Sequence, residues 1–380
     1  MKTYSTLIVT VGSSLLGNIR RNETLKALLE KDDIQTLSAQ MTVNQWGNPE
    51  TTQIYGSEIN STVSLIRNFE QIENAKFIQG TLYLFISDTS EGKTVGELLK
   101  NYFEQNEEFR FGSVQLIQLK GLTHSDEHKF GTEGLRNVVR EFARIAKNHA
   151  NNVIVNSTGG YKAQIAFALA LGQALKFPVY YRFEAFSKII KMPPLPVSLD
   201  WEIYLNHYDI LETLEAKGLM EEKELEKYGY TNYAALPQEI KSFVDREKLD
   251  KTHCIEFNPM GQVFIESARE LIRLETILPE TKKDPQNKIL FNTKESHAIE
   301  FDQKHKTSQK IAGLSFVEKV HMYDFHAREK DELKVTLSED NIIRVVYGNK
   351  KGTAYYQVQT TGKGKREYIA AIEEIKKILE

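Results

Sequence analysis

Residues 156–162 (NSTGGYK) combine features that bind phosphate groups, and they stand between an apolar run at 152–156 and an apolar stretch at 163–175. Two adjacent glycines allow a tight turn with exposed amides, the hydroxyl side chains offer donors, and Lys162 brings a cation to the start of the predicted helix. Free N–H groups at a helix N-terminus favour bound anions. The spacing fits neither the Walker loop nor the dinucleotide motif G-x-G-x-x-G. The sequence therefore predicts a strand-to-helix loop for a phosphate-bearing ligand, with contacts from Thr158, Gly159, Gly160 and Lys162.

Two more loops of small and polar residues follow apolar runs. One is 10–14 (TVGSS), after the run 6–11, and the other is 87–90 (SDTS), after the run 81–86. In an open α/β sheet, ligands bind beyond the carboxyl ends of the strands, so these loops are expected to meet around one ligand. The contacts predicted from them are Gly12, Ser13, Ser14, Ser87 and Asp88.

The C-terminal part offers a different chemistry. Residues 341–366 contain six basic residues and no acidic residue, interleaved with Tyr347, Tyr355 and Tyr356. Cations neutralise phosphates and aromatic rings stack on bases, so this composition predicts a surface for RNA, with a solvated lysine-rich hairpin as the alternative. The basic residues are Arg344, Lys350, Lys351, Lys363, Lys365 and Arg366.

The elements that must position these residues change in kind along the chain. Apolar runs of strand length alternate with helix-like spacing from residue 6 to residue 183, which predicts an α/β, Rossmann-like domain with a mainly parallel sheet. The proline-rich run 192–196 cannot continue a helix or a strand ladder, so it marks the end of this domain. Short helices with charged faces and one brief strand between 201 and 278 are typical of a winged helix–turn–helix domain.

Beyond a polar linker at 279–288, the pattern changes again. Strand-like runs at 333–337, 342–347 and 354–360, followed by a helix at 367–379, predict a small α+β domain. The predicted domains are 1–200, 201–278 and 289–380.

The composition excludes several classes of protein. A net charge of -3 over 380 residues means that any surface for nucleic acid must be local. The single cysteine, Cys254, cannot form an internal disulfide or a cysteine-rich zinc site, and it is compatible with a reducing compartment. No run approaches the roughly 20 apolar residues of a membrane span, and the N-terminus shows no signal-peptide pattern. We expect a cytoplasmic protein without a membrane partner.

The motifs of the first 200 residues resemble a known family. In this order, TVGSSLL at 10–16, LYLFISDTSEG at 82–92, GLRNVVREFA at 134–143, NSTGGYKAQ at 156–164 and MPPLPVSLDW at 192–201 are similar to the CARF domain of type III CRISPR systems. The resemblance implies a homodimer that binds a cyclic oligoadenylate, with cyclic tetra-adenylate favoured, and a winged helix domain that can follow. A C2 dimer presents each loop twice, which matches the two-fold symmetry of such a ring. Some members cleave the ring, and here Ser13 and Lys162 would support that reaction.

Residues 342–368 are similar to the end of RelE-type mRNA interferases, in which a strand with an arginine precedes a turn and the next strand ends in a basic turn and a tyrosine. The resemblance implies a ribonuclease that needs no metal or other cofactor and cuts mRNA on the ribosome. A 2′-hydroxyl would attack the adjacent phosphate, with the charge neutralised by basic groups and the leaving oxygen protonated by a side chain. Arg344, Lys363, Lys365 and Arg366 would supply charge, Tyr368 or Tyr356 would stack a base or transfer a proton, and His321 and His326 are alternative acid–base groups.

Three alternatives stay open. The D-x-K within 300–304 (EFDQK) resembles the metal-binding acid and lysine of PD-(D/E)xK nucleases. The R-x-x-x-x-H pattern of HEPN ribonucleases occurs at Arg144 and His149, inside a predicted helix of the first domain. A ligand-responsive DNA-binding regulator is the third, although the glutamates within 221–226 make this part of the winged helix a poor surface for phosphates.

Overall fold

The computed structural model describes residues 2–43, 45–150, 152–183, 186, 188–193, 199–291, 296–327, 332–338 and 340–380. The chain forms two compact units, Met1–Asp200 with Tyr208–Ser267, and Trp201–His207 with Ala268–Glu380. We call them the N-terminal unit and the C-terminal unit, and each is described by itself. The division into domains 1–200, 201–278 and 289–380 stays a prediction. Residues 194–196 of the proline-rich run lie outside the described residues.

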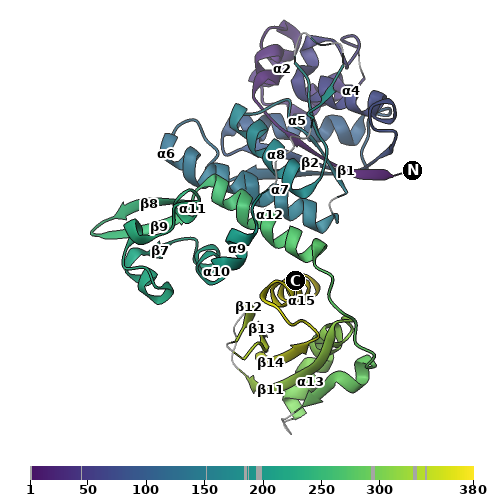
Figure 1. The fold of residues 1–380 in the computed structure, drawn as a ribbon. Coiled ribbons are helices and arrows are strands. Elements are labelled where there is room, and N and C mark those ends of the chain that lie inside the picture. The colour runs from purple at the N-terminus through teal and green to yellow at the C-terminus, as the bar shows by residue number, and fades with distance from the viewer. Residues whose placement is uncertain are drawn as a thin grey trace. The chain divides into compact units, whose positions relative to one another are not determined.

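A six-stranded sheet forms the centre of the N-terminal unit, in the order β3-β2-β1-β4-β5-β6. Figure 1 labels two of its neighbouring strands, β1 and β2. The pairs from β3 to β5 are parallel, and β6 runs antiparallel to β5. The prediction of an α/β fold with a mainly parallel sheet is therefore confirmed. The strands are β1 (Thr3–Thr10), β2 (Lys76–Ser87), β3 (Ser113–Leu119), β4 (Val153–Asn156), β5 (Val179–Tyr181) and β6 (Ile190–Lys191).

Helices cover both faces of this sheet. In β1, Leu7 and Val9 pack on one face with α1 to α5, whereas Ile8 packs on the other face with α7 and α8. Because successive side chains of a strand point to opposite faces, a strand covered on both sides must be apolar throughout. The helices are α1 (Ser14–Ile19), α2 (Glu23–Glu30), α3 (Ile34–Thr42), η1 (Gln53–Tyr55), α4 (Gly56–Glu73), α5 (Ser90–Gln105), α6 (Glu127–Lys129), the π-helix η2 (Phe130–Gly134), α7 (Leu135–Asn148) and α8 (Lys162–Leu175).

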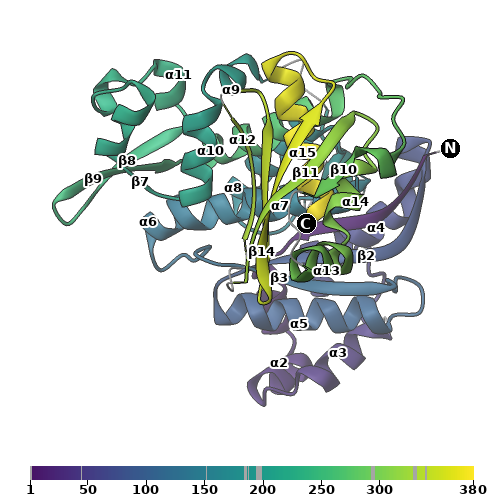
Figure 2. The same cartoon turned by 90° about the horizontal axis from the view of Figure 1, so that it is seen from below.

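The segment Tyr208–Ser267 adds short helices and a three-stranded antiparallel sheet in the order β7-β9-β8. Figure 2 shows β8 and β9 as a hairpin beside β7. A winged helix–turn–helix domain stays a prediction for this segment. Its elements are α10 (Tyr208–Lys217), β7 (Met220–Glu221), η3 (Glu222–Tyr228), η4 (Tyr233–Ala235), α11 (Gln238–Lys241), β8 (Val244–Leu249), β9 (Thr252–Phe257) and α12 (Pro259–Glu275), which runs on into the C-terminal unit.

Ion pairs join this segment to α7. Arg136 lies 2.6 Å from Glu256 on β9, and Arg140, one helical turn further, lies 3.3 Å from Glu215 on α10. The side chains of Arg136 and Glu256 are only 12% and 11% exposed. Burial raises the pKa of Glu256, and the guanidinium of Arg136 opposes that shift. These pairs neutralise the charges at the contact between α7 and the segment, since a buried charge left without a partner would be costly.

A five-stranded sheet forms the C-terminal unit, in the order β10-β11-β14-β13-β12. The pair β10–β11 is parallel and the others are antiparallel. Helices α13, α14 and α15 share one core with a single face of the sheet. The elements are α9 (Glu202–Asn206), η5 (Pro285–Lys288), β10 (Ile289–Phe291), α13 (Ser296–His305), α14 (Thr307–Ala312), β11 (Val317–His326), β12 (Glu332–Leu337), β13 (Ile343–Asn349), β14 (Gly352–Thr360) and α15 (Lys365–Leu379). Within the described ranges, no helix is long and apolar enough to cross a bilayer.

Candidate functional site

A cavity of about 260 Å³ lies at the carboxyl ends of β1 and β2 in the N-terminal unit. Four of the predicted ligand contacts line it, and they come from all three of the predicted loops: Gly12, Ser13, Ser87 and Gly160. Backbone amides and hydroxyl groups from three strand ends therefore surround one space, as expected for an open α/β sheet. The cavity is also lined by residues that were not predicted, namely Val11, Thr89, Glu91, Gly92, His124 and Tyr161.

The other predicted contacts do not line this cavity, and several of their side chains form hydrogen bonds within the protein. The Asp88 carboxylate accepts hydrogen bonds from Gly121 N (3.1 Å) and Gln118 Nε2 (2.5 Å), and the Gly121 bond is the main reason that its pKa is lowered. Thr158 Oγ1 donates to Asn156 Oδ1 (2.6 Å). These two side chains shape the loops rather than face the cavity. Ser14 Oγ lies 3.2 Å from Ser57 Oγ, and Lys162 is exposed as the first residue of α8.

A buried carboxyl group beneath the loops was missed by sequence reasoning. Glu58, in the first turn of α4, is 0% exposed, and its Oε1 accepts a hydrogen bond from Gly12 N at 2.7 Å. Its Oε2 accepts from Ser57 Oγ at 3.0 Å. Burial raises the pKa of Glu58, and the hydrogen bonds from Gly12 and Ser57 only partly oppose this shift. Glu58 therefore holds the Gly12 loop from below.

Gly159 must be glycine because of the same carboxyl group. A Cβ atom at Gly159 would overlap Glu58 Oε1 and lie 2.8 Å from the carbonyl oxygen of Thr10. Thr10 Oγ1 donates to the carbonyl of Gly159 at 2.5 Å, which ties β1 to the loop. Gly160 follows with φ +90°, a conformation that side chains rarely adopt. The double glycine thus serves close packing against Glu58 as well as exposing amides.

Replacing the ionisable carboxyl group of Glu58 is expected to change how the free energy of unfolding depends on pH. Its pKa is raised above 4.5 in the folded protein, so the folded state retains a proton that the unfolded chain has released. The free energy of unfolding should therefore fall as the pH rises from about 4.5 to the folded-state pKa. Glu58→Gln should abolish this fall while keeping an acceptor for Gly12. Denaturant unfolding between pH 4.5 and pH 8 measures it, with the exposed Glu97→Gln as the control; an unchanged pH slope in Glu58→Gln would contradict the assignment.

The C-terminal unit presents an open sheet face with charged and aromatic side chains. Val320 and Met322 on β11 are buried against the helices, so His321 between them lies on the opposite face. The strand register pairs His321 with Gln357 on β14, and Gln357 with Arg344 on β13. Neighbouring strands lie about 4.8 Å apart, which places His321 and Arg344 roughly 10 Å from each other across one row. Both side chains can reach a group bound over Gln357.

Aromatic rings continue this face. The rings of Tyr323 and Tyr355 lie 6.2 Å apart, and the ring of His326 packs edge-on against Tyr355 at 5.3 Å. His326 Nε2 also lies 3.4 Å from Asp324 Oδ2. Rings at this spacing can stack on successive bases of a single strand. Of the residues predicted to bind RNA, this face holds Arg344 and Tyr355, together with both alternative histidines.

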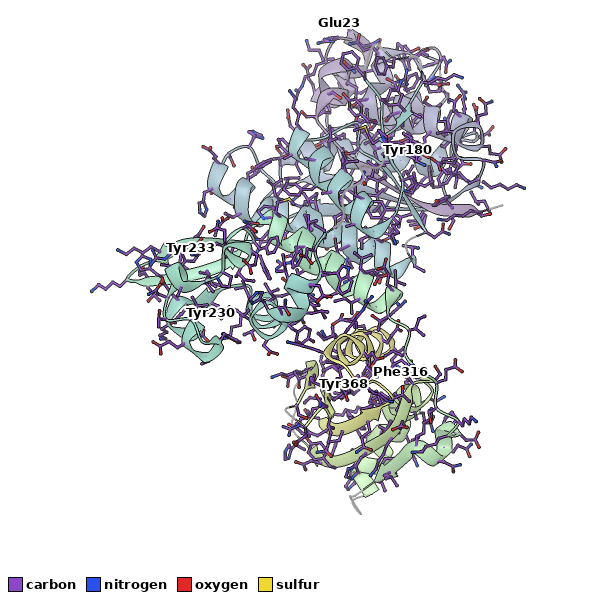
Figure 3. All side chains as sticks on the ribbon, viewed as in Figure 1. Glu23, Tyr180, Tyr230, Tyr233, Phe316 and Tyr368 are labelled. Carbon is purple, nitrogen blue, oxygen red and sulfur yellow. The ribbon has the colours of Figure 1, made fainter. Side chains whose placement is uncertain are left out.

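The other predicted catalytic residues are placed elsewhere. Arg366 on α15 stacks over the ring of Trp201 at 4.2 Å, and its Nε donates to Thr276 Oγ1 at 3.0 Å. Lys363 and Lys365 are exposed around the N-terminus of α15, and Tyr368 follows them on that helix (Figure 3). Their common role with Arg344 stays a prediction.

Tyr356 requires a correction, because it lies in the core instead of on the open sheet face. It is 0% exposed, and its Oη donates to Asp302 Oδ1 at 2.9 Å. Burial raises the pKa of the Tyr356 phenol, so it cannot give up a proton near neutral pH. Asp302, in turn, is 1% exposed and accepts bonds from the amide (2.9 Å) and hydroxyl (2.5 Å) of Ser308 at the start of α14. The D-x-K of 300–304 thus lies on a helix with its aspartate in the core.

Tyr356→Phe is expected to destabilise the C-terminal unit by about 1–3 kcal/mol, because the buried Asp302 loses one of its donors. A purely structural role predicts that any activity of the folded fraction stays unchanged. Denaturant unfolding and a cleavage assay on the same preparation measure the two effects. Tyr355→Phe on the open face is the matched control and should leave stability unchanged. A stable Tyr356→Phe variant without activity would instead support a catalytic tyrosine.

The residues of the HEPN-like pattern also make internal contacts. Arg144 Nη2 pairs with Glu141 Oε2 at 2.6 Å on the same helix. The His149 ring nitrogens lie 3.1 Å from Thr6 Oγ1 and 3.0 Å from Tyr83 Oη. These contacts fix the end of α7 against β1 and β2, which is a structural role.

Comparison with known proteins bears on the N-terminal unit. Residues 53–195 match the model of a family described as CRISPR-associated protein (Cas_APE2256). The matched Cas_APE2256 segment includes Glu58, Ser87, His124 and Gly160, whereas the Gly12 loop precedes it. No curated protein matches the chain. Among solved structures, Can2 from Sulfobacillus thermosulfidooxidans in complex with cyclic tetra-adenylate is similar at 9% identity, over 73% of this chain and 68% of that chain, with a TM-score of 0.25.

Proposed function

We propose that this protein is a ribonuclease of type III CRISPR defence that is controlled by a cyclic oligoadenylate, with cyclic tetra-adenylate favoured. The cavity between the Gly12, Ser87 and Gly160 loops carries the proposal, because it lies within a unit whose residues 53–195 match a CRISPR-associated family. Hydroxyl groups and amides in that cavity suit phosphates and riboses. Two copies in a homodimer would bind one two-fold symmetric ring.

The effector would be the open face of the C-terminal sheet. In the proposed reaction, His321 accepts the proton of a ribose 2′-hydroxyl while that oxygen bonds to the adjacent phosphorus. Arg344 stabilises the charge on the phosphate, and the departing 5′-oxygen takes a proton from water. The products are a 2′,3′-cyclic phosphate and a 5′-hydroxyl. Nε2 of His321 is buried, with no hydrogen-bond partner among the described residues, so proton exchange would use Nδ1.

Cleavage assays with and without cyclic tetra-adenylate test the proposal. The purified protein is incubated with mRNA on translating ribosomes and with naked RNA, and the new ends are mapped chemically. We expect ligand-dependent cuts in ribosome-bound mRNA that leave 2′,3′-cyclic phosphates. Cleavage of naked nucleic acid that needs Mg²⁺ would contradict it in favour of a metal nuclease, and operator-specific DNA binding without cleavage would indicate a regulator.

The same assays show whether the ligand is consumed. Ser13 and His124 both line the cavity, and an imidazole beside a bound ring suits proton transfer during its cleavage. Chromatography of the cyclic tetra-adenylate after incubation would show linear fragments if the N-terminal unit cleaves its activator.

A further inference from the structure

The C-terminal end of α13 meets the turn between β13 and β14. His305 Nε2 lies 3.0 Å from Asn349 Nδ2, at the end of β13 just before that turn. The imidazole also packs near Phe301, with ring centroids 4.8 Å apart, and near Tyr347, at 5.8 Å. His305 is therefore half-buried and held in position by aromatic rings and an amide. The contact makes one continuous surface from two segments that are distant in sequence.

Positive charge is concentrated around this contact. Five exposed lysines lie at the end of α13, on the following residues into α14 and on the β13–β14 turn, and no ion pair involves any of them within the part of the chain that the structure describes: Lys304, Lys306, Lys310, Lys350 and Lys351. The ammonium groups of Lys304 and Lys351 lie close enough for the second to lower the pKa of the first. The acid that opposes this effect is Glu300. Like charges held together without a partner favour the binding of an anion.

The same charges act on His305. Burial is the main reason that its pKa is lowered, and Lys304, Lys351 and Lys310 lower it further, while Asp302 acts in the opposite direction. The imidazole is therefore neutral at neutral pH. A bound anion would screen the lysines and raise this pKa, so His305 reports on occupancy of the surface.

We infer that Lys304, His305, Lys310, Asn349 and Lys351 form a binding site for the phosphate backbone of RNA, which we call the α13 phosphate site. RNA is favoured because β13 runs from the open sheet face to this site. Arg344 and Asn349 are the second and last residues of that strand, about 17 Å apart at 3.3 Å per residue. They are five positions apart and therefore lie on opposite faces of the sheet, so an RNA strand that contacts both would pass around the exposed turn at Lys350 and Lys351.

The inference rests on the proposed function, which identifies the ligand as RNA. It adds a second place, outside the cleavage face, at which the RNA is bound. Its test uses the full chain and a single-stranded 2′-O-methylated oligoribonucleotide, which cannot be cleaved through its 2′-oxygens. Binding is followed by fluorescence anisotropy over a range of salt concentrations. In parallel, the pKa of His305 is measured by NMR with and without the oligonucleotide.

The double variant Lys304→Gln/Lys351→Gln should bind the oligonucleotide about tenfold more weakly, with a salt slope lower by about 1.4, which is the value for two lost phosphate contacts on a single strand. In the parent protein, the pKa of His305 should rise on binding. The matched control is Lys282→Gln/Lys283→Gln, two exposed lysines of the same unit outside the site. Circular dichroism establishes that each variant is folded.

Unchanged affinity and salt slope in Lys304→Gln/Lys351→Gln would overturn the inference, as would an equal loss in the control. The inference would also be overturned if Lys304→Gln/Lys351→Gln lost binding to an acidic protein and kept its affinity for the oligonucleotide. Failure of the proposed function looks different. A protein that binds the oligonucleotide through this site but cuts no RNA would retain the α13 phosphate site and lose the ribonuclease assignment.

Discussion

Gly159→Ala is expected to abolish binding of the cyclic ligand and to destabilise the N-terminal unit. The new methyl group would overlap the buried carboxyl of Glu58 and press on the Thr10 carbonyl at 2.8 Å. Relief requires the loop to move, which breaks the Thr10–Gly159 bond and displaces the carboxyl that holds Gly12. Overpacking and a lost buried hydrogen bond each cost about 1–3 kcal/mol, so we expect a total of about 2–6 kcal/mol.

Thermal unfolding and calorimetric titration with cyclic tetra-adenylate measure the two effects of Gly159→Ala. Gly17→Ala is the matched control, since a Cβ atom at Gly17 in α1 meets nothing within 4 Å. Alanine within a helix should be neutral there or stabilise by about 0.5–1 kcal/mol. A Gly159→Ala variant with the melting temperature and affinity of the parent would show that the loop does not need close contact with Glu58.

Arg344→Ala is expected to reduce the rate of RNA cleavage by about 10²–10³-fold, with little effect on stability. Its side chain is exposed on the open sheet face, so truncation leaves no cavity and no buried unpaired group. The variant lacks the guanidinium that would stabilise the phosphate charge beside His321 and Gln357. Removing one positioned donor to a developing charge typically slows a reaction by about 10²–10³-fold. Arg344→Lys should recover only part of the rate, since an ammonium lacks the planar fork.

Single-turnover cleavage of ribosome-bound mRNA in the presence of cyclic tetra-adenylate measures the effect of Arg344→Ala. Lys377→Ala, an exposed lysine on α15, is the control and should retain the parent rate. His321→Ala should lose about 10²–10⁴-fold, as expected for a proton-transfer group. Full activity in Arg344→Ala would show that the open face is not the site of cleavage. It would favour a site formed by Lys363, Lys365 and Arg366 instead.

Buried parallel strands made the N-terminal unit easy to predict. Runs such as 6–11 and 81–86 are apolar throughout because helices cover both faces, and small residues end them where the cavity lies. Glu58 was missed for a physical reason. It lies next to the apolar series Ile59, Val63 and Phe69 of α4, and its burial depends on the Gly12 loop, 46 residues away in sequence, so no local pattern marks it.

The C-terminal unit shows two limits of sequence patterns. Register shifts in β11 between Val317 and Lys319 and between Met322 and Asp324 disturb its alternation, and this strand was not predicted. In β14, Tyr355 and Tyr356 are adjacent and therefore point to opposite faces. Either tyrosine suits either face, so only the strand register shows that Tyr356 is buried and Tyr355 lies beside His326.

The contact between Trp201 and Arg366 has a consequence for synthesis of the protein. The segment Trp201–His207 belongs to the C-terminal unit, although residues of the N-terminal unit precede and follow it. At about 5–20 residues per second, Trp201 is made on the order of ten seconds before the arginine that stacks on it. The C-terminal unit therefore cannot complete its packing until translation has passed residue 366. A nascent chain that stalls earlier would carry a complete N-terminal unit beside an unfinished C-terminal unit.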